Sequence, residues 1–346
     1  MAAWSDLIDD LIAEILLRIP PDEPAHLVRA SLVCKPWRRL LTDPAFLRRY
    51  RAFHRTPPML GFLHNLDYHK ASSSAPRFVP TTAASPLSPS AIGYPSWWCA
   101  LDCRHGRILI RFFDRLELMT GAVVCAARDC DHLDCHQSPF LVVLVGRGDV
   151  GDVNSWACVY SSETGEWSAE APIVFNLFVA MFPSLLVKDT LFFSCGYDDK
   201  KILGYNIGRQ ELCEIDLPFW DDYEQGIIMT AEDGGLGFVT MEPCSLVLWS
   251  RNVGDDGIKY WKQSKVIQLD MQNLFGNPRD LVGFTECTRT IFILSDVGVF
   301  AIELKSGQVK KVGDSKPYII VLPYMSFYTP DLAKGKLAHP AVTVMR

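Results

Sequence analysis

One short segment of the sequence concentrates side chains that could bind a metal ion. CAARDCDHLDCHQ places three cysteines and two histidines between Cys125 and His136, and zinc prefers thiolate and imidazole ligands. The spacing C-x4-C-x-H-x2-C-H differs from the paired C-x2-C pattern of common zinc motifs, and the sequence contains no second such cluster. We therefore predict a polar loop between strands, with no metal and no cofactor. The weak candidate ligands are Cys130, His132, Cys135 and His136.

A second segment, VVLVGRGDVGDV, has the glycine spacing of dinucleotide-binding loops at Gly146, Gly148 and Gly151. That motif binds a pyrophosphate only when a helix follows and offers its N-terminus. Residues 153–160 are instead patterned as a strand, so we predict a hairpin loop. The sequence has no serine-nucleophile elbow and no His-Glu-x-x-His pair, so we assign no catalytic residue.

Composition describes a globular protein of about two domains. The chain has 346 residues, of which 49% are hydrophobic and 21% charged. Residues 1–55 contain nine Lys or Arg and seven Asp or Glu, a net charge of +2. Because the whole chain has a net charge of −6, the remaining residues carry −8. An acidic main domain is a poor platform for phosphate backbones, so we expect no nucleic acid.

The sequence gives no sign of export or membrane insertion. The first residues lack the basic flank and apolar core of a signal peptide, and no apolar run reaches the ~18 residues of a membrane span. The eleven cysteines are scattered, several of them in runs patterned as strands. We therefore expect free thiols and an intracellular protein, in the cytoplasm or the nucleus, with no membrane partner.

Residues 1–55 are patterned as three short helices. In SDLIDDLIAEILLRIPP, Leu7, Leu11 and Ile15 recur at helical spacing and form an apolar stripe. Three short helices bury little area, and the stripe is wider than their own core needs, so we expect its surplus to contact a partner. The residues expected to start or end the helices are Pro20, Pro24, Pro36 and Asp43.

The arginines of this segment offer an alternative, a helix-turn-helix that binds phosphates. Against it, the first helix is acidic at Asp9, Asp10 and Glu14. We interpret the arginines as a solvated face. They are Arg38, Arg39, Arg48, Arg49, Arg51 and Arg55.

The order LIDDLIAEILLRIPP followed by LVRASLVCKPWRRLLTDPAFLRR closely resembles the F-box, an adaptor motif that binds a Skp1-type protein in cullin–RING ubiquitin ligases. The family usually has Leu-Pro where this chain has Leu7-Ile8, which implies somewhat weaker binding. The resemblance implies that a set of apolar residues lies at or just beneath the Skp1-facing surface. The set is Leu7, Ile8, Leu11, Ile15, Leu16, Pro20, Val33, Cys34 and Trp37.

The rest of the chain is patterned as a repeating β structure. Glycine-containing turns are expected at Thr120-Gly121, Thr164-Gly165, Ile207-Gly208 and Ser306-Gly307, which gives a period of about 44 residues. Several strands per such period indicate a β-propeller, here of about six blades. The runs expected to be strands are Ile108–Phe113, Leu141–Val145, Trp156–Tyr160, Leu191–Ser194, Leu236–Met241, Leu246–Trp249, Ile291–Leu294 and Val299–Leu304, with a further short strand at Arg77–Pro80.

Segments such as RHGRILI and DVGVFAIELKSGQVKKV make this region similar to the β-propeller-like domain that follows the F-box in a large set of plant proteins, especially from grasses. The fold expected is therefore α+β and multidomain, with an F-box at 1–55 and an all-β domain at 56–346. The resemblance implies a non-catalytic substrate receptor of an SCF-type E3 ubiquitin ligase, reaching cullin and RING subunits through Skp1, with proteasomal degradation of an unknown target protein.

Two alternatives remain open: a Skp1-bound interaction protein outside degradation, and a propeller that binds a small ligand or is an enzyme. Exposed aromatic side chains could hold the target on the β domain. The weak candidates are Trp97, Trp98, Trp220 and Tyr223.

Overall fold

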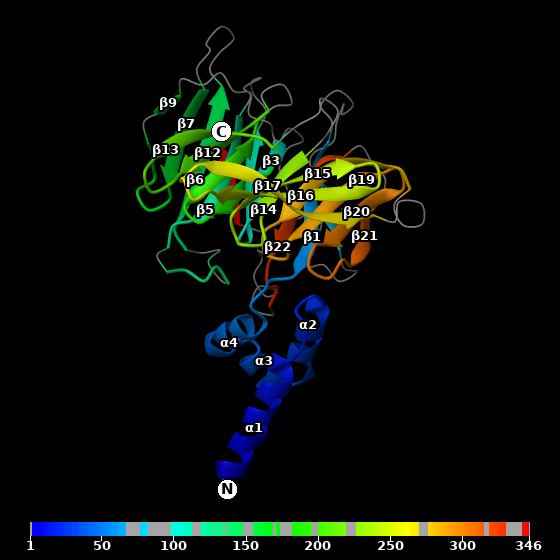
Figure 1. Ribbon diagram of the computed structural model, residues 1–346. Coiled ribbons are helices and arrows are strands. Elements are labelled where there is room, and N and C mark those ends of the chain that lie inside the picture. Colours follow the sequence, from blue (N-terminus) through cyan, green and yellow to red (C-terminus); the bar gives the residue numbers. More distant parts are fainter. Residues whose placement is uncertain are drawn as a thin grey trace.

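A computed structural model describes residues 2–66, 77–81, 98–112, 119–127, 129–133, 135, 138–147, 155–168, 171–173, 182–195, 200–218, 226–269, 276–314, 318–329 and 341–345. A helical module, residues 2–54, precedes a β domain that begins at residue 59 (Figure 1). None of the described helices is long and apolar enough to span a bilayer.

The helical module has four helices, which are α1 (Ala2–Leu17), α2 (Pro24–Val33), α3 (Lys35–Leu40) and α4 (Pro44–His54). Three were expected, and the middle one is divided. Cys34 is extended, with φ −156° and ψ 164°, and interrupts the helix. Pro36 has no N–H to donate and so fits the first turn of a new helix. Asp43 caps α4 by accepting bonds from the amides of Ala45 and Phe46.

The first part of the β domain contains short strands that follow one another closely. These are β1 (Met59–Leu66), β2 (Arg77–Pro80), β3 (Trp98–Arg104), β4 (Arg107–Phe112), β5 (Met119–Cys125), β6 (Phe140–Arg147), β7 (Ser155–Ser161), β8 (Glu166–Trp167) and β9 (Ala171–Ile173).

The second part continues in the same way. Its strands are β10 (Leu185–Val187), β11 (Thr190–Ser194), β12 (Lys201–Asn206), β13 (Glu211–Asp216), β14 (Gly226–Thr230), β15 (Leu236–Glu242), β16 (Ser245–Val253), β17 (Lys259–Gln268), β18 (Pro278–Thr285), β19 (Thr290–Ser295), β20 (Gly298–Glu303), β21 (Val309–Gly313), β22 (Tyr318–Met325) and β23 (Ala341–Met345).

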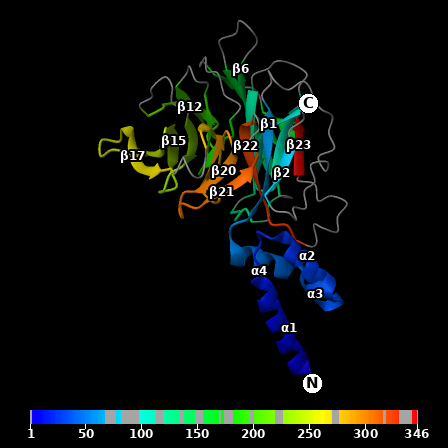
Figure 2. The ribbon, with the colours of Figure 1, turned by 90° about the vertical axis from the view of Figure 1, so that its right-hand side faces the viewer.

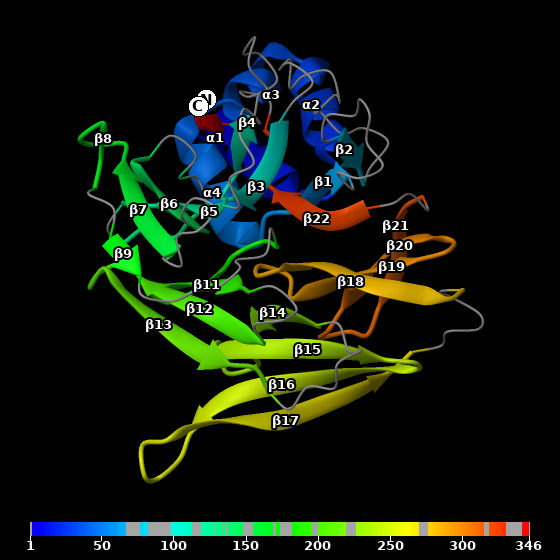
Figure 3. The same ribbon diagram turned by 90° about the horizontal axis from the view of Figure 1, so that it is seen from above.

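These strands form a propeller. Five sheets of the described chain are antiparallel throughout, and seen from above they lie around a common centre (Figure 3). Their strand orders are β2-β1-β22, β5-β6-β7-β8 with β9 beside β7, β10-β11-β12-β13, β14-β15-β16-β17 and β18-β19-β20-β21. The pairing of β1 with β22, from Met59 opposite Met325 to Leu66 opposite Tyr318, joins the two ends of the ring.

The expectation of about six blades is corrected to five. The remaining sheet, β23-β4-β3, is not an antiparallel meander, because β23 pairs parallel to β4. One expected turn contributed to the error: Gly121 lies inside β5, not in a turn. A side chain there would come within 2.6 Å of Leu144, so this glycine permits close packing of β5 on β6.

The other turns and the strands expected in the β domain are confirmed where the structure describes them. Turns lie at Thr164-Gly165, Ile207-Gly208 and Ser306-Gly307, and β2 matches the predicted strand Arg77–Pro80. All eight apolar runs fall on strands, apart from Leu304, which lies in the turn after β20, and Phe113, which lies outside the described residues. Those strands are β4, β6, β7, β11, β15, β16, β19 and β20.

The core of the propeller lies between neighbouring blades. One cluster packs Ile227 and Val239 of the β14–β17 blade against Ile291 and Ile302 of the β18–β21 blade. Each of these side chains is at most 5% exposed, and full burial of such a side chain stabilises the fold by about 1.5–3 kcal/mol. The alternation of apolar residues along each strand therefore holds adjacent blades together.

Candidate functional site on the helical module

Helix α1 presents apolar side chains to solvent. Leu11 is 56% and Ile15 66% exposed, whereas Leu16 and Leu17 on the same helix are buried in the core of the module. Apolar side chains are therefore present on both sides of α1, but only one side packs in the core of the module, and the other is exposed. Leu7 and Ile8 belong to the part of α1 whose side chains fall outside the described residues.

A second apolar surface lies at the end of α2. Leu32 is 74% and Val33 65% exposed, and Cys34 follows them in an exposed position. Trp37, in α3, is half-buried against the core of the module, and Pro20 is exposed in the turn after α1. Leu32 was not among the residues expected at this surface, although its position beside Val33 in an amphipathic helix could have indicated it.

Helix α4 fixes the orientation of α1 from the inner side. The hydroxyl of Tyr50 donates to the carbonyl of Ile19 at 2.8 Å, and the His54 ring lies 2.9 Å from the carbonyl of Leu17. Arg49 forms an ion pair with Glu14. These contacts hold the C-terminal end of α1 while leaving Leu11 and Ile15 uncovered.

The β domain contacts the module at a different place. Phe327, which follows β22, lies in the core of the module, and Leu133 packs against that core from the loop between β5 and β6. In both side views α1 extends away from the β domain, with its N-terminus at the far end (Figures 1 and 2). The exposed side of α1 is therefore accessible to another protein.

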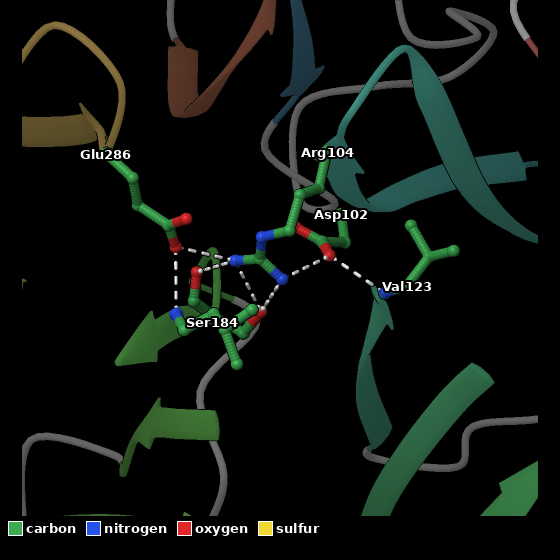
Figure 4. Close-up of polar contacts among 6 residues, drawn as sticks. Asp102, Arg104, Val123, Ser184 and Glu286 are labelled. Carbon is green, nitrogen blue, oxygen red and sulfur yellow. Dashed lines mark hydrogen bonds and ion pairs between the residues drawn. The ribbon is translucent and has the colours of Figure 1, made fainter. Parts of the chain in front are cut away.

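A buried ionic network lies where several sheets meet (Figure 4). Arg104, at the end of β3, donates to Asp102 at 3.1 Å, to Glu286 at 2.8 Å and to the carbonyl of Ser184 at 3.0 Å. Asp102 also accepts the amide of Val123 in β5 at 2.9 Å. The network thus connects β3 and β5 with the segments before β10 and after β18.

The charges of this network are paired within the fold and adjoin only a small cavity, which favours a structural role. Burial is the largest influence on Asp102 and raises its pKa to about 6, although Arg104 and the Val123 amide act in the opposite direction. Burial lowers the pKa of Arg104, but the carboxylates of Asp102 and Glu286 raise it by a larger amount. The pKa of Arg104 therefore lies above its usual value, and the guanidinium stays charged. The adjoining cavity is about 70 Å³, far below the roughly 300–1,000 Å³ of typical ligand pockets.

The aromatic candidates for target binding receive no support at the one described position. Trp98 is 3% exposed and packs in the core formed by β1, β2, β3, β4 and β22, so it is not available at the surface. Trp97, Trp220 and Tyr223 lie outside the described residues.

Among the described residues, the first element after the glycine-rich segment is a strand and not a helix. Gly146 lies in β6, and the next described element is the strand β7. A side chain at Gly146 would come within 2.5 Å of the Trp156 ring. This glycine is therefore explained by packing, and Gly148 and Gly151 lie outside the described residues.

The structure brings three of the four weak metal candidates together with a cysteine that had been left out. The ligand atoms of Cys125, Cys130, His132 and Cys135 all lie within 4.8 Å of one another. His136 lies outside the described residues. Burial, followed by the neighbouring Cys125 and Cys130, raises the pKa of Cys135 to about 12, so the thiol form is favoured without a cation.

Comparison with known protein families identifies residues 4–49 as an F-box domain. This span includes α2 and α3 completely, most of α1 and the first half of α4. The chain therefore consists of an F-box domain at its N-terminus and a β-propeller after it. No curated protein matches the sequence significantly.

Solved structures share only coarse features with this chain. One is an oligogalacturonate lyase in complex with manganese, with 12% identity, a TM-score of 0.33, and coverage of 59% of this chain and 55% of that one. Another is the extracellular domain of the one-component system BT4673 from B. thetaiotaomicron, with 10% identity, a TM-score of 0.30, and coverage of 62% and 33%. A third is apo AztD from Citrobacter koseri, with 15% identity, a TM-score of 0.25, and coverage of 51% and 46%. The chain thus aligns with less than two thirds of each of these proteins.

Proposed function

We propose that this protein is the substrate-receptor subunit of an SCF-type E3 ubiquitin ligase. The observation that carries the proposal is the exposed apolar side of α1, within a segment that matches the F-box domain. F-box domains bind Skp1 within SCF complexes. Leu11 and Ile15 provide the area that a partner helix would cover, and burial of two such side chains favours association by about 3–6 kcal/mol before the costs of binding.

The proposed Skp1-facing surface has two parts. The first is the exposed side of α1, and the second is the end of α2, where Leu32 and Val33 are exposed. Leu16 and Trp37 support this surface from beneath by packing in the core of the module. The proposed surface residues are Leu7, Ile8, Leu11, Ile15, Leu16, Pro20, Val33, Cys34 and Trp37, to which we add Leu32.

The two parts of the chain have separate roles in this proposal. We assign residues 1–55 to Skp1 binding and residues 56–346 to holding a target protein. The receptor itself forms no covalent bond; it raises the effective concentration of target lysines near a ubiquitin-charged enzyme held elsewhere in the complex. Cullin and RING subunits would be reached only through Skp1.

The test is capture of a purified Skp1-type adaptor by the full-length protein and by the double variant Leu11→Asp with Ile15→Asp. Each aspartate would place an unpaired charge in the interface, at a cost of several kcal/mol, so capture should be lost. Val297→Asp is the matched control, because Val297 is also an exposed apolar residue but lies in the turn between β19 and β20. Undiminished capture by the double variant would refute this interface.

Co-purification from cells separates the degradative role from its alternative. A substrate receptor should bring cullin down together with Skp1, and the double variant should lose both. Recovery of Skp1 without cullin would instead favour a Skp1-bound protein outside degradation. Comparing proximity-labelled proteins between the two variants, with the proteasome inhibited, would identify the target.

A further inference from the structure

We propose that Cys125, Cys130, His132 and Cys135 form a structural zinc site that braces the F-box against the propeller. Cys125 is the last residue of β5, and the other three lie in the loop that leads to β6. Three sulfurs and one imidazole nitrogen are a complete ligand set for tetrahedral zinc. All four positions are supplied by the protein, which is typical of structural and not of catalytic zinc.

The distances fit this coordination. In a tetrahedral site with Zn–S bonds of about 2.3 Å, the sulfurs lie about 3.8 Å apart. Here all ligand atoms are within 4.8 Å of one another, and Cys135 Sγ is 3.7 Å from His132 Nδ1. A contraction of about an ångström would therefore complete the site, without any rearrangement of the strands.

The local backbone holds the ligands in this arrangement. The amide of His132 donates to Cys130 Sγ at 3.4 Å, which fixes the position of that sulfur. Asp129 and His132 both adopt positive φ, 52° and 58°, which turns the loop back on itself. The His132 ring stacks on His105 with centroids 4.2 Å apart and planes 5° apart, and this fixes the direction of Nδ1.

The surrounding charge suits the same assignment. Zinc with three thiolates and a neutral imidazole carries a net charge of about −1. Arg107 is 1% exposed and donates to the carbonyls of Cys135 and Ser138, at the edge of the cluster. A buried guanidinium at this position would offset the charge of the zinc–thiolate group.

The site lies at the junction of the two parts of the chain. Leu133, between two of the ligands, packs against the core of the helical module. A cavity of about 300 Å³ lies at the same junction, lined by His132 and Cys135 on one side and by Arg51, Arg55 and Phe327 on the other. A metal that holds this loop would therefore fix the orientation of the F-box relative to the propeller.

The first test is metal content of the full-length protein purified under reducing conditions. We expect about one zinc per chain, lost in the double variant Cys130→Ser with Cys135→Ser. Cys244→Ser is the matched control, because Cys244 is an exposed cysteine in the turn between β15 and β16. Zinc that persists in the double variant would overturn the assignment.

Cobalt binding tests the ligand set first in the unmutated protein, where folding is not perturbed. Addition of Co²⁺ to the zinc-stripped, unmutated protein should produce the visible absorption of tetrahedral, thiolate-bound cobalt. His132→Asn should weaken that absorption several-fold, and His136→Asn should leave it unchanged. The reverse pattern, or the absence of thiolate-to-cobalt bands in the unmutated protein, would overturn the proposal.

Proteolysis tests the bracing role. Removal of zinc by a chelator should accelerate cleavage in the connection at residues 55–58, and added Zn²⁺ should restore protection while Mg²⁺ should not. Equal cleavage with and without zinc would show that the metal does not brace this junction.

Discussion

The ring of Tyr50, in α4 of the F-box, meets the ring of Phe327 edge to face, with centroids 6.2 Å apart. Phe327 follows β22, the strand that pairs with β1 and joins the ends of the propeller. The amide of Ser326 also donates to the carbonyl of Pro58 at 3.2 Å. Phe327, which comes late in the sequence, is thus part of the core of the N-terminal helical module.

Phe327→Ala should loosen the connection between the two parts of the chain. Phe327 is 4% exposed, and replacing a buried phenylalanine with alanine costs about 3–5 kcal/mol. We expect faster proteolysis of the connection at residues 55–58 and a lower unfolding temperature of the F-box. The control is Phe53→Ala, because Phe53 is 51% exposed on the same helix as Tyr50; an equal effect of both variants would contradict a special role for Phe327.

Leu32→Asp with Val33→Asp should weaken binding of a Skp1-type adaptor at least tenfold. The two adjacent side chains are 74% and 65% exposed, and a charge there must be desolvated when a partner covers it. Titration calorimetry with purified adaptor measures the effect. Arg29→Ala, at an exposed polar position of the same helix, should change the affinity little; unchanged affinity of the double variant would remove the end of α2 from the interface.

Asp102 should make the stability of the propeller fall as pH rises between about 4 and 6. Its pKa is about 6 in the fold against 3.8 for the reference group, so the folded state binds more protons than the unfolded state in this window. At about 1.4 kcal/mol per pKa unit, the contribution is on the order of 2–3 kcal/mol, present below pH 4 and lost above pH 6.

The measurement for Asp102 is the unfolding free energy as a function of pH. Asp102→Asn should remove this component of the pH dependence, whereas Asp255→Asn, at an exposed turn, should keep it. The same pH dependence in the wild type and the Asp102 variant would contradict the assignment.

Gly61→Val should disrupt closure of the ring. A side chain at Gly61, in β1, would come within 2.1 Å of the Phe78 ring and 2.6 Å of the carbonyl of Val79. Overpacking of this kind costs about 1–3 kcal/mol or more, which should lower the unfolding temperature by several degrees. Gly208→Ala serves as the control, since the nearest atom to its added carbon is 3.7 Å away.

The F-box was predictable from the sequence because its signals are local. Pro24 and Asp43 start helices where expected, and the i, i+4 spacing of Leu11 and Ile15 marks the side of α1 that stays exposed. An interruption at Pro36 was expected, but not that a separate helix begins there, since a proline can either kink a helix or begin a new one, and only the backbone of the preceding residue decides which.

The propeller was predictable in its strands but not in its count. Alternating apolar residues identify a strand wherever it pairs, but β4 pairs on one side with β3 and on the other with β23, which lies more than two hundred residues later. Gly121 was expected in a turn, but it lies in β5, where the lack of a side chain lets β6 approach β5 closely. Pairing between distant segments is not encoded in local pattern, so blade number could not be derived from spacing.

The grouping of Cys125, Cys130, His132 and Cys135 could not be predicted for a similar reason. The spacing from Cys125 to Cys135 does not match common zinc motifs, so the sequence favoured a polar loop. The positive φ angles of Asp129 and His132 fold that irregular spacing into a compact group. Ligand sets that depend on such turns are visible only once the backbone is known.

The pairing of β1 with β22 also bears on how the protein is made. During translation, β1 leaves the ribosome long before its partner β22 has been synthesised. The core of the F-box likewise cannot be completed until Phe327 has been synthesised. A translation product that stops before residue 318 would lack both, and would leave apolar surface available to chaperones and proteases. Only a chain synthesised beyond Phe327 can complete the core of its helical module, which couples synthesis of the late strands to the folding of the first helices.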